Sequence, residues 1–235
     1  MPDPYPLFLQ GGLAARPIEK VGRFVHAALD AGDGRRAAWV TPQGFNYGDF
    51  GQVHNRGPRL LELRNQLYQA AVYGARGFLW YTYGQVANYP DLDLGIRWLS
   101  REVADLRPYL LAPLQEVEIA VEADHPEHLH AALRRVGSQA LVIVVSTATA
   151  AQEVALRLPE LAGDLQVVSE GRTVAAPGGV LRDHFDVSDT HLYATDPIEV
   201  RFDAPVTTAA LRLLVTGNRA GQDATVVYEV EAYAE

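Results

Sequence analysis

Aromatic side chains close a short apolar run, where they could contact a ligand. Trp80, Tyr81 and Tyr83 end the run 76–83, and successive side chains of a strand point to opposite faces. One face of this strand would therefore present an aromatic ring at its end. Aromatic faces can stack on the flat apolar surface of a ligand, and they also fill protein cores. Trp80 and Tyr83 are predicted substrate contacts, with core packing as the alternative.

Polar side chains stand at the ends of two further short runs. Asp3 and Tyr5 lie near the N-terminus, and Gln43 follows the apolar run 37–41. Asp3 is a candidate catalytic or hydroxyl-binding carboxylate, and the alternative is a turn residue before a proline. Tyr5 either packs or lines a ligand cleft. Gln43 can bond a polar group of a ligand with both its amide oxygen and its nitrogen. Tyr5 and Gln43 are therefore also predicted substrate contacts.

Composition argues against several functional classes. The net charge of −9 and the lack of a basic stripe argue against nucleic acid as a partner. The sequence has no apolar run near the roughly 20 residues of a membrane span. Cysteine is absent, which excludes disulfides and thiolate chemistry. No glycine-rich phosphate loop of the usual pattern is present, and no cofactor is expected.

A histidine-rich segment superficially resembles a metal site. His125, His128 and His130 occur in the stretch HPEHLH, and this spacing could bring two imidazoles together. A metal centre also needs further ligands and outer partners that hold them, which this stretch does not supply. Exposure at a turn is the simpler interpretation, so no metal site is predicted.

The first half of the chain alternates between helical and strand-like patterns. Apolar residues recur at helical spacing in three segments, and two short apolar runs lie between or after them. The expected elements are a helix over 17–31, a strand over 37–41, a long loop over 44–58, a helix over 59–73, a strand over 76–83 and a helix over 94–111. This order is the rhythm of a (β/α) barrel, in which ligands lie at the carboxyl ends of the strands.

The second half consists of short alternating runs that are separated by turn residues, which predicts antiparallel strands. The expected strands are 117–122, 129–135, 140–146, 153–158, 165–169, 183–193, 198–202, 210–215 and 226–233. The change of rhythm places a domain boundary between residues 113 and 114. The fold class is therefore α/β plus all-β: residues 1–113 would form the last three βα units of a truncated (β/α) barrel, and residues 114–235 an antiparallel β-sandwich.

Three stretches resemble the C-terminal half of (β/α)8 glycoside hydrolases of the β-galactosidase and cellulase type. They are DPYP at 3–6, AAWVTPQGF at 37–45 and AVYGARGFLWYTY at 71–83, which are similar to the last three barrel strands. The stretch DHFDVSDTHLY at 183–193 looks like a strand of the small β-sandwich that such enzymes often carry. Residues 198–235 also resemble the closing strands of a galactose-binding-like module.

The resemblance implies a carbohydrate ligand and leaves the chemistry incomplete. Glycoside hydrolysis needs two carboxylates, and the resemblance places the nucleophilic glutamate at the end of the seventh strand. Gln43 stands there in this chain, and an amide cannot form the glycosyl ester. The expectation is a fragment of a carbohydrate-binding or carbohydrate-hydrolysing protein that is inactive alone. The alternative is a non-catalytic carbohydrate-binding or adhesive β-sandwich protein with a barrel relic.

A truncated barrel has further consequences for partners and for location. Its open sheet edges would promote self-association. The first residues do not form a signal peptide, but a longer protein could carry one upstream. The compartment is therefore left open, with an extracytoplasmic location as one option for the longer protein.

Overall fold

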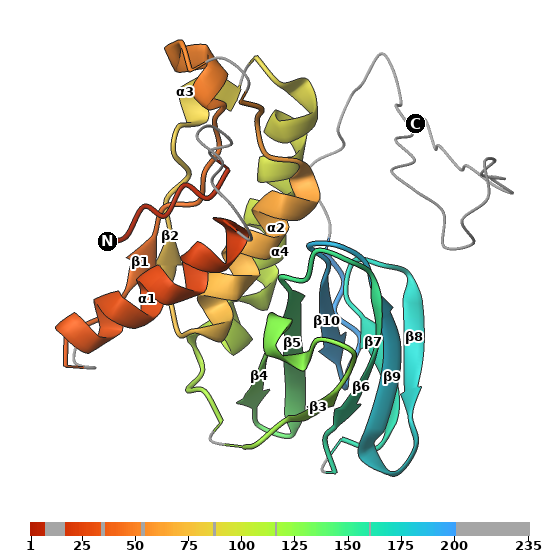
Figure 1. Cartoon of the computed structure of the whole chain (residues 1–235). Helices are drawn as coiled ribbons and strands as arrows, with labels where there is room; N and C mark the ends of the chain where they lie inside the picture. Colours follow the sequence, from red (N-terminus) through yellow and green to blue (C-terminus); the bar gives the residue numbers. More distant parts are fainter. Residues whose placement is uncertain are drawn as a thin grey trace, which may run out of the picture. The chain divides into compact units, whose positions relative to one another are not determined.

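The computed structural model describes residues 1–7, 17–33, 36–52, 55–86, 88–115, 117–159 and 161–200 (Figure 1). Met1–Arg201 forms one compact unit, and Phe202–Glu235 is a separate one. The strands expected at 210–215 and 226–233 fall outside the described residues, as do all but the first three residues of the stretch 198–235 that resembles a galactose-binding-like module. The account below concerns the first unit alone.

Helices and short parallel strands alternate in the first half of this unit. A 3-10 turn Pro17–Glu19 leads into α1 (Lys20–Ala31), followed by β1 (Trp39–Val40), a 3-10 turn Tyr47–Phe50, α2 (Leu60–Val72), β2 (Gly77–Phe78), α3 (Tyr83–Val86) and α4 (Pro90–Leu111). The helices predicted over 17–31, 59–73 and 94–111 are confirmed. In α2, Leu63 and Leu67 are one turn apart and both fully buried, as the helical spacing requires.

The strand predicted over 76–83 is shorter than expected. Only Gly77 and Phe78 form a ladder with β1, and a single bridge between Gln43 and Tyr81 extends the pairing. Tyr83 begins α3, so the prediction that it ends a strand is wrong. The local sequence YGQV has no strand partner there and closes into one helical turn instead.

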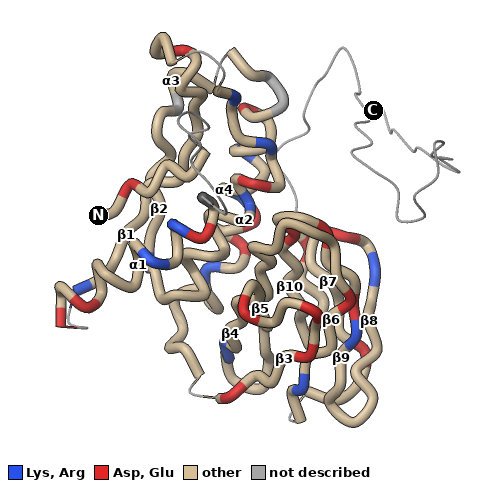
Figure 2. Tube along the Cα trace, in the orientation of Figure 1, with Lys and Arg blue, Asp and Glu red and all other residues tan. Residues whose placement is uncertain are grey.

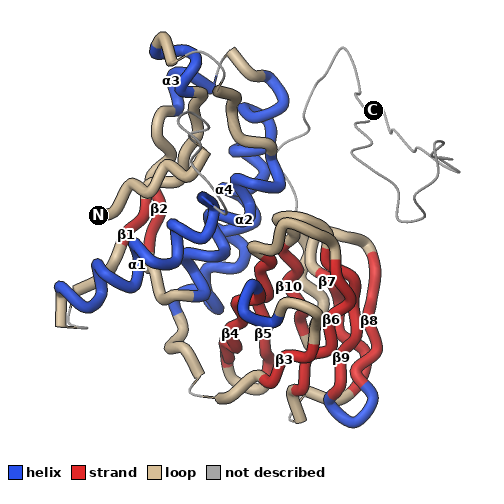
Figure 3. The backbone as a smooth tube through the Cα atoms, viewed as in Figure 1, coloured by secondary structure: helices blue, strands red, loops and turns tan. Residues whose placement is uncertain are grey.

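Residues 1–7, β1 and β2 lie side by side. β1 pairs with β2 in parallel, and the backbone N–H of Thr41 donates to the carbonyl of Pro2 at 3.0 Å, which holds residues 1–7 beside β1. Val40 packs against Val21 and Val25 of α1 on one face of the sheet. On the other face Trp39 and Leu79 are 46% and 48% exposed, so no helix among the described residues buries them. Among the described residues these strands do not close into a barrel (Figure 3).

The second half consists of two antiparallel sheets. One has the strand order β4-β5-β10-β7-β8 and the other β3-β6-β9. The strands are β3 (Ala120–Glu122), β4 (Leu129–Val136), β5 (Gln139–Ser146), β6 (Gln152–Arg157), β7 (Gly163–Val167), β8 (Arg172–Ala176), β9 (Val180–Phe185) and β10 (Thr190–Ala194). Side chains from both sheets share one core, in which Val142 and Val144 meet Leu156 and Phe185. The unit is therefore a mixture of helices and antiparallel sheets.

Three strand assignments differ from the structure in this half. The strand predicted over 198–202 is absent from residues 198–200, the part of it that the structure describes. The run 183–193 is not one strand but parts of β9 and β10, because the backbone N–H of Asp186 donates to Asp189 Oδ2 at 2.7 Å and closes a turn between them. Ser188 in this turn has a φ of 66°. The strand β8 was missed because its short sequence, RTVAA, alternates weakly.

The helices pack directly on the larger sheet. Leu141, Ile143 and Val145 of β5 share a core with residues of α2 and α4, while Val142 and Val144 face the smaller sheet. This strand is buried on both faces, which explains its continuous apolar sequence. The domain boundary predicted between residues 113 and 114 stays a prediction.

A buried arginine links the helices to this sheet by hydrogen bonds. Arg134 of β4 is fully buried, and its guanidinium donates to the carbonyl oxygens of Ala71 and Ala112, at the ends of α2 and α4. Burial, together with the nearby Arg76, lowers the pKa of Arg134 to about 10. A cation at the carboxyl ends of two helices is favoured by their dipoles.

The distribution of charged residues and the length of the helices concern the expectations about nucleic acid and membranes. Basic residues are scattered among acidic ones along the described elements (Figure 2). Within the described ranges, no helix is both long enough and apolar enough to span a membrane.

Candidate functional site

Five aromatic rings gather at the carboxyl ends of β1 and β2 and form the strand-end cluster: Tyr5, Phe45, Tyr47, Phe50 and Tyr81. Phe45 is its buried hub, only 3% exposed. The Phe45 ring centroid lies 4.9 Å from Tyr47, 5.1 Å from Tyr5, 5.5 Å from Phe50 and 5.6 Å from Tyr81, in edge-to-face arrangements. These distances lie in the range in which aromatic pairs attract each other.

The rim of the strand-end cluster is open to solvent. Phe50 is 51% exposed and Tyr81 46%. Tyr5 and Tyr81 stack with centroids 5.4 Å apart and an interplanar angle of 27°, so no further ring fits between them. A ligand would instead lie on the exposed surface of Tyr81 or Phe50. Phe50 and Tyr81 are therefore the rings of the strand-end cluster that solvent reaches most.

Asp3 supplies the charge of this site. Burial, and then the Asp3 carboxylate that bonds to its hydroxyl, raise the pKa of Tyr5 to about 12. Burial, and then Asp3, also raise the pKa of Tyr47. Both phenols therefore keep their protons at neutral pH and can donate hydrogen bonds, while the Asp3 carboxylate accepts them. The site combines apolar ring surface with neutral donors and one anionic acceptor.

Replacing Asp3 with asparagine should lower the pKa of Tyr5 from about 12 toward, but not to, the ordinary value of 10, because burial is the larger cause. Since the folded pKa is raised, the neutral phenol stabilises the fold below pH 10, and this contribution is lost as pH rises toward 12. NMR titration of Cζ-labelled tyrosine measures the shift, with the Tyr5 signal assigned by its loss in Tyr5→Phe. Asp49→Asn is the matched control and should leave Tyr5 unchanged.

Gln43 lies beneath the strand-end cluster rather than on its surface. It is fully buried. Its Oε1 accepts from the backbone N–H of Leu7 at 2.8 Å, and its Nε2 donates to the carbonyls of Phe45 at 3.1 Å and Leu7 at 3.4 Å. The amide is thus occupied by backbone groups. This placement favours a role in holding the chain over the predicted direct contact with a sugar.

Trp80 points away from the strand-end cluster. Its Nε1 donates to Ser100 Oγ of α4 at 3.0 Å, and its ring packs against the core formed by α2, α4 and β5. The neighbouring Tyr81 takes the opposite face, as strand alternation requires. This placement favours the core-packing alternative for Trp80 and makes Tyr81 the exposed ring. The side chain of Tyr83 lies outside the described residues, so its contact stays a prediction.

Sequence reasoning missed the part of the site that comes from the loop after β1. Asn46 accepts from the backbone N–H of Gly48 at 2.8 Å and so caps the turn that carries Tyr47 and Phe50. The hydroxyl of Tyr89 donates to Asp49 at 2.8 Å and ties this turn to the start of α4. The spacing F-x-Y-x-x-F at 45–50 was a signal, but nothing local shows that the three rings converge.

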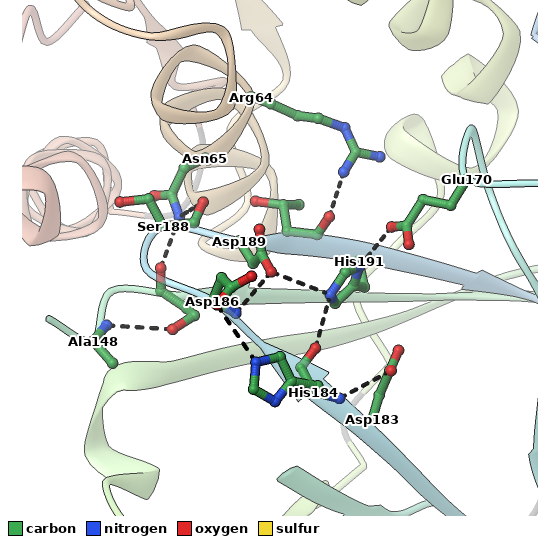
Figure 4. A network of polar contacts seen from close by, with 12 residues as sticks. Arg64, Asn65, Ala148, Glu170, Asp183, His184, Asp186, Ser188, Asp189 and His191 are labelled. Atoms are coloured by element: carbon green, nitrogen blue, oxygen red, sulfur yellow. Dashed lines mark hydrogen bonds and ion pairs between the residues drawn. The ribbon is translucent and has the colours of Figure 1, made fainter. Parts of the chain in front are cut away.

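A second polar network joins α2 to the turn between β9 and β10 (Figure 4). Asn65 Nδ2 donates to the carbonyls of Ser146 at 2.8 Å and Ser188 at 3.0 Å. His191 bonds to Glu170 at 2.5 Å and to the carbonyl of His184 at 3.2 Å. A bond to Glu153 is the main cause that raises the pKa of His184. These groups satisfy one another, so this network is a structural joint.

The histidine-rich segment is likewise engaged within the protein. His128 lies 2.9 Å from Glu19 and 3.1 Å from Glu127, and His130 bonds to Tyr73 at 3.0 Å and Thr147 at 3.1 Å. Burial is the main cause that lowers the pKa of His130. Within the part of the chain that the structure describes, no group of three or more His, Asp or Glu side chains could hold a metal ion.

No protein-family model and no curated protein matches the sequence. Several solved structures similar to the chain are glycoside hydrolases. An Anoxybacillus alpha-amylase is 15% identical, with 66% of this chain and 38% of the amylase covered and a TM-score of 0.46. A putative alpha-galactosidase from Bacteroides fragilis is 10% identical, with 77% and 38% covered and a TM-score of 0.49. A protein named AmyP, solved with maltose, is 13% identical, with 70% and 42% covered and a TM-score of 0.48. The chain thus spans less than half the length of these proteins.

Proposed function

We propose that this chain binds carbohydrate at the strand-end cluster and does not hydrolyse it by itself. The observation that carries the proposal is the exposed aromatic rim beside Asp3. Tyr81 and Phe50 are each about half exposed, although large aromatic side chains are usually buried. They lie at the carboxyl ends of parallel strands, where α/β proteins place their ligands.

The groups of the site suit a neutral sugar. The ring of Tyr81 offers a flat apolar surface for the C–H face of a sugar ring. The Asp3 carboxylate accepts hydrogen bonds from sugar hydroxyls, while the protonated phenols of Tyr5 and Tyr47 donate or accept. Binding sites of small molecules commonly combine an apolar lining with a few polar groups in this way.

The absence of hydrolysis follows from the carboxylates. Both glycosidase mechanisms need a pair of them across the scissile bond. Where the resemblance expects the nucleophilic glutamate, Gln43 is a buried amide whose oxygen and nitrogen are bonded to backbone groups. Asp3 is the carboxylate that contacts the strand-end cluster through Tyr5. Asp49, the other carboxylate beside the strand-end cluster, accepts a hydrogen bond from the Tyr89 hydroxyl. Because an amide stands at position 43, the catalytic pair that the resemblance expects is incomplete among the described residues.

The finer interpretation of the fold belongs to the same proposal. We propose that residues 2–7, β1 and β2 occupy the places of three adjacent strands of a (β/α)-barrel sheet and that the two antiparallel sheets are its appended β-sandwich. Two features support this: β1 and β2 run parallel, and the described helices pack on one face of them. Parallel sheets are normally covered on both faces. The bare face at Trp39 and Leu79 would be covered by further barrel strands or, in their absence, by self-association.

The purified chain is expected to bind an oligosaccharide and to release no product. Isothermal titration with maltotriose, cellotetraose and galactotriose measures binding, and nitrophenyl glycosides of the same sugars measure turnover. The expected rates equal those of buffer, because the carboxylate pair is incomplete. Turnover that survives repurification and disappears in Asp3→Asn would show that the chain is an enzyme. Failure to bind any sugar in a wider panel would refute the binding proposal.

A further inference from the structure

Gln43 joins the two backbone segments that carry the strand-end cluster. Its side-chain amide bonds both the N–H and the C=O of Leu7, as a neighbouring strand would, and also the carbonyl of Phe45. Its own backbone N–H donates to Gln66 Oε1 of α2 at 2.9 Å. This grip needs one acceptor and two donor hydrogens on the same planar group, which an amide provides and a carboxylate does not.

Hydrogen bonds at both ends fix the segment that Gln43 holds, and Pro4, Pro6 and Leu7 within it are buried. Residues 1–7 form no helix or strand, and they are anchored at one end by the bond from Thr41 to Pro2 and at the other by Gln43. Between these anchors, Tyr5 has a φ of 33°, which residues other than glycine rarely adopt. The backbone at Tyr5 therefore stays in this conformation only because its surroundings hold it there. Tyr5 in turn stacks on Tyr81.

We propose that Gln43 is a positioning residue that fixes the Asp3–Tyr5 segment against Tyr81 and so sets the affinity of the site without touching the ligand. The part of this inference that concerns affinity rests on the proposed function. The part that concerns the place of Tyr5 does not. A glutamate at position 43 would therefore not restore a catalytic nucleophile, because its carboxylate would be buried against the carbonyls of Leu7 and Phe45.

The variant Gln43→Glu tests this through pH. Burial raises the pKa of such a carboxyl group, so it is protonated at pH 5 and can donate one hydrogen bond and accept another, which keeps the contact from the Leu7 N–H and one of the two bonds to carbonyls. At pH 9 it is charged and repelled by both carbonyls. The ring-current shifts of the Tyr5 protons should then be native at pH 5 and move toward those of free tyrosine at pH 9. Affinity for maltotriose, used as the neutral probe, should fall at least tenfold over the same interval, while wild type shows no such step.

Two further variants separate positioning from general loss of stability. Gln69→Glu is the matched control, because Gln69 is also fully buried and grips Gly22 N–H and the Ile18 carbonyl in the same way, away from the strand-end cluster. It should destabilise the protein as pH rises and leave the Tyr5 shifts unchanged. Gln43→Met keeps the volume and removes every side-chain bond, so its Tyr5 shifts should be displaced at both pH values. Native Tyr5 shifts in Gln43→Met, or displaced shifts in Gln69→Glu, would overturn the proposal.

A variant that does not fold and a wild type that does not bind maltotriose lead to different conclusions. If the Gln43 variants do not fold, exchange of the Leu7 amide in wild type decides, because the bond to Gln43 should slow it by at least tenfold relative to an unprotected amide. An unprotected Leu7 would refute the positioning role. If wild type does not bind maltotriose, affinity must be tested with another sugar, whereas the Tyr5 shifts still decide whether Gln43 positions the segment.

Discussion

Glu102→Gln is expected to lower the free energy of unfolding by about 3 kcal/mol, which is the usual cost of breaking a buried ion pair. The Glu102 carboxylate is fully buried in α4 and accepts four hydrogen bonds. Arg64 of α2 donates at 3.1 Å and 3.3 Å, while Tyr68 and Ser169 each donate at 2.6 Å. An amide would place an N–H against one of these donors and leave Arg64 without its counter-charge.

Urea unfolding measures this cost, and the same helix provides the control. Asp105 pairs with Arg101 one turn away at 2.9 Å, on the partly exposed side of α4. Asp105→Asn should cost less than about 0.5 kcal/mol, because water screens such pairs. Equal losses in the two variants would show that the bonds of Glu102 do not hold the helices on the sheet.

Local pattern was sufficient for most helices and strands. The leucines of α2 repeat at helical spacing, and the run 140–146 is too short and too apolar for anything but a buried strand. The ends of the helices and strands were harder to predict from the sequence. Whether Tyr83 continued the strand or began α3 depended on the partner available beside it, since β1 offers no residue opposite Tyr83.

The site was predictable only in part. Strand alternation shows that Trp80 and Tyr81 take opposite faces, but not which face meets α4. That choice depends on Ser100, twenty residues further along the chain. The grip of Gln43 on Leu7 spans 36 residues, and the bond from Arg134 to Ala71 spans 63. Contacts between residues so far apart in the chain depend on the assembled fold and leave no periodic signal in the sequence.

Tyr81→Ala and Trp80→Ala should have opposite effects. Tyr81 is 46% exposed, so its truncation removes ring surface from the site while leaving a small cavity at most. Sugar affinity should fall about tenfold, or about 1.4 kcal/mol, with little loss of stability. Trp80 is packed against the core and bonded to Ser100. Trp80 is only partly buried, so its truncation should cost stability by less than the roughly 3 kcal/mol that marks the lower end for a fully buried tryptophan, with affinity nearly unchanged.

Thermal melting and sugar titration on the two variants and wild type measure both effects. Phe24→Ala is a suitable control for loss of an aromatic ring, since Phe24 is 39% exposed on α1 and is not part of the strand-end cluster. It should change neither quantity by much. Loss of affinity in Trp80→Ala without loss of stability would reverse the assignment of the two rings.

The most direct measurement of whether the strand-end cluster binds carbohydrate is an NMR titration of the wild-type protein with the sugar that binds best in the calorimetric panel. The expected result is saturable shifts in the ring signals of Tyr5, Phe50 and Tyr81, with the backbone signals of Glu153 and Arg157 in β6 unchanged. Saturable shifts confined to the antiparallel sheets, with the strand-end cluster silent, would contradict the proposed site.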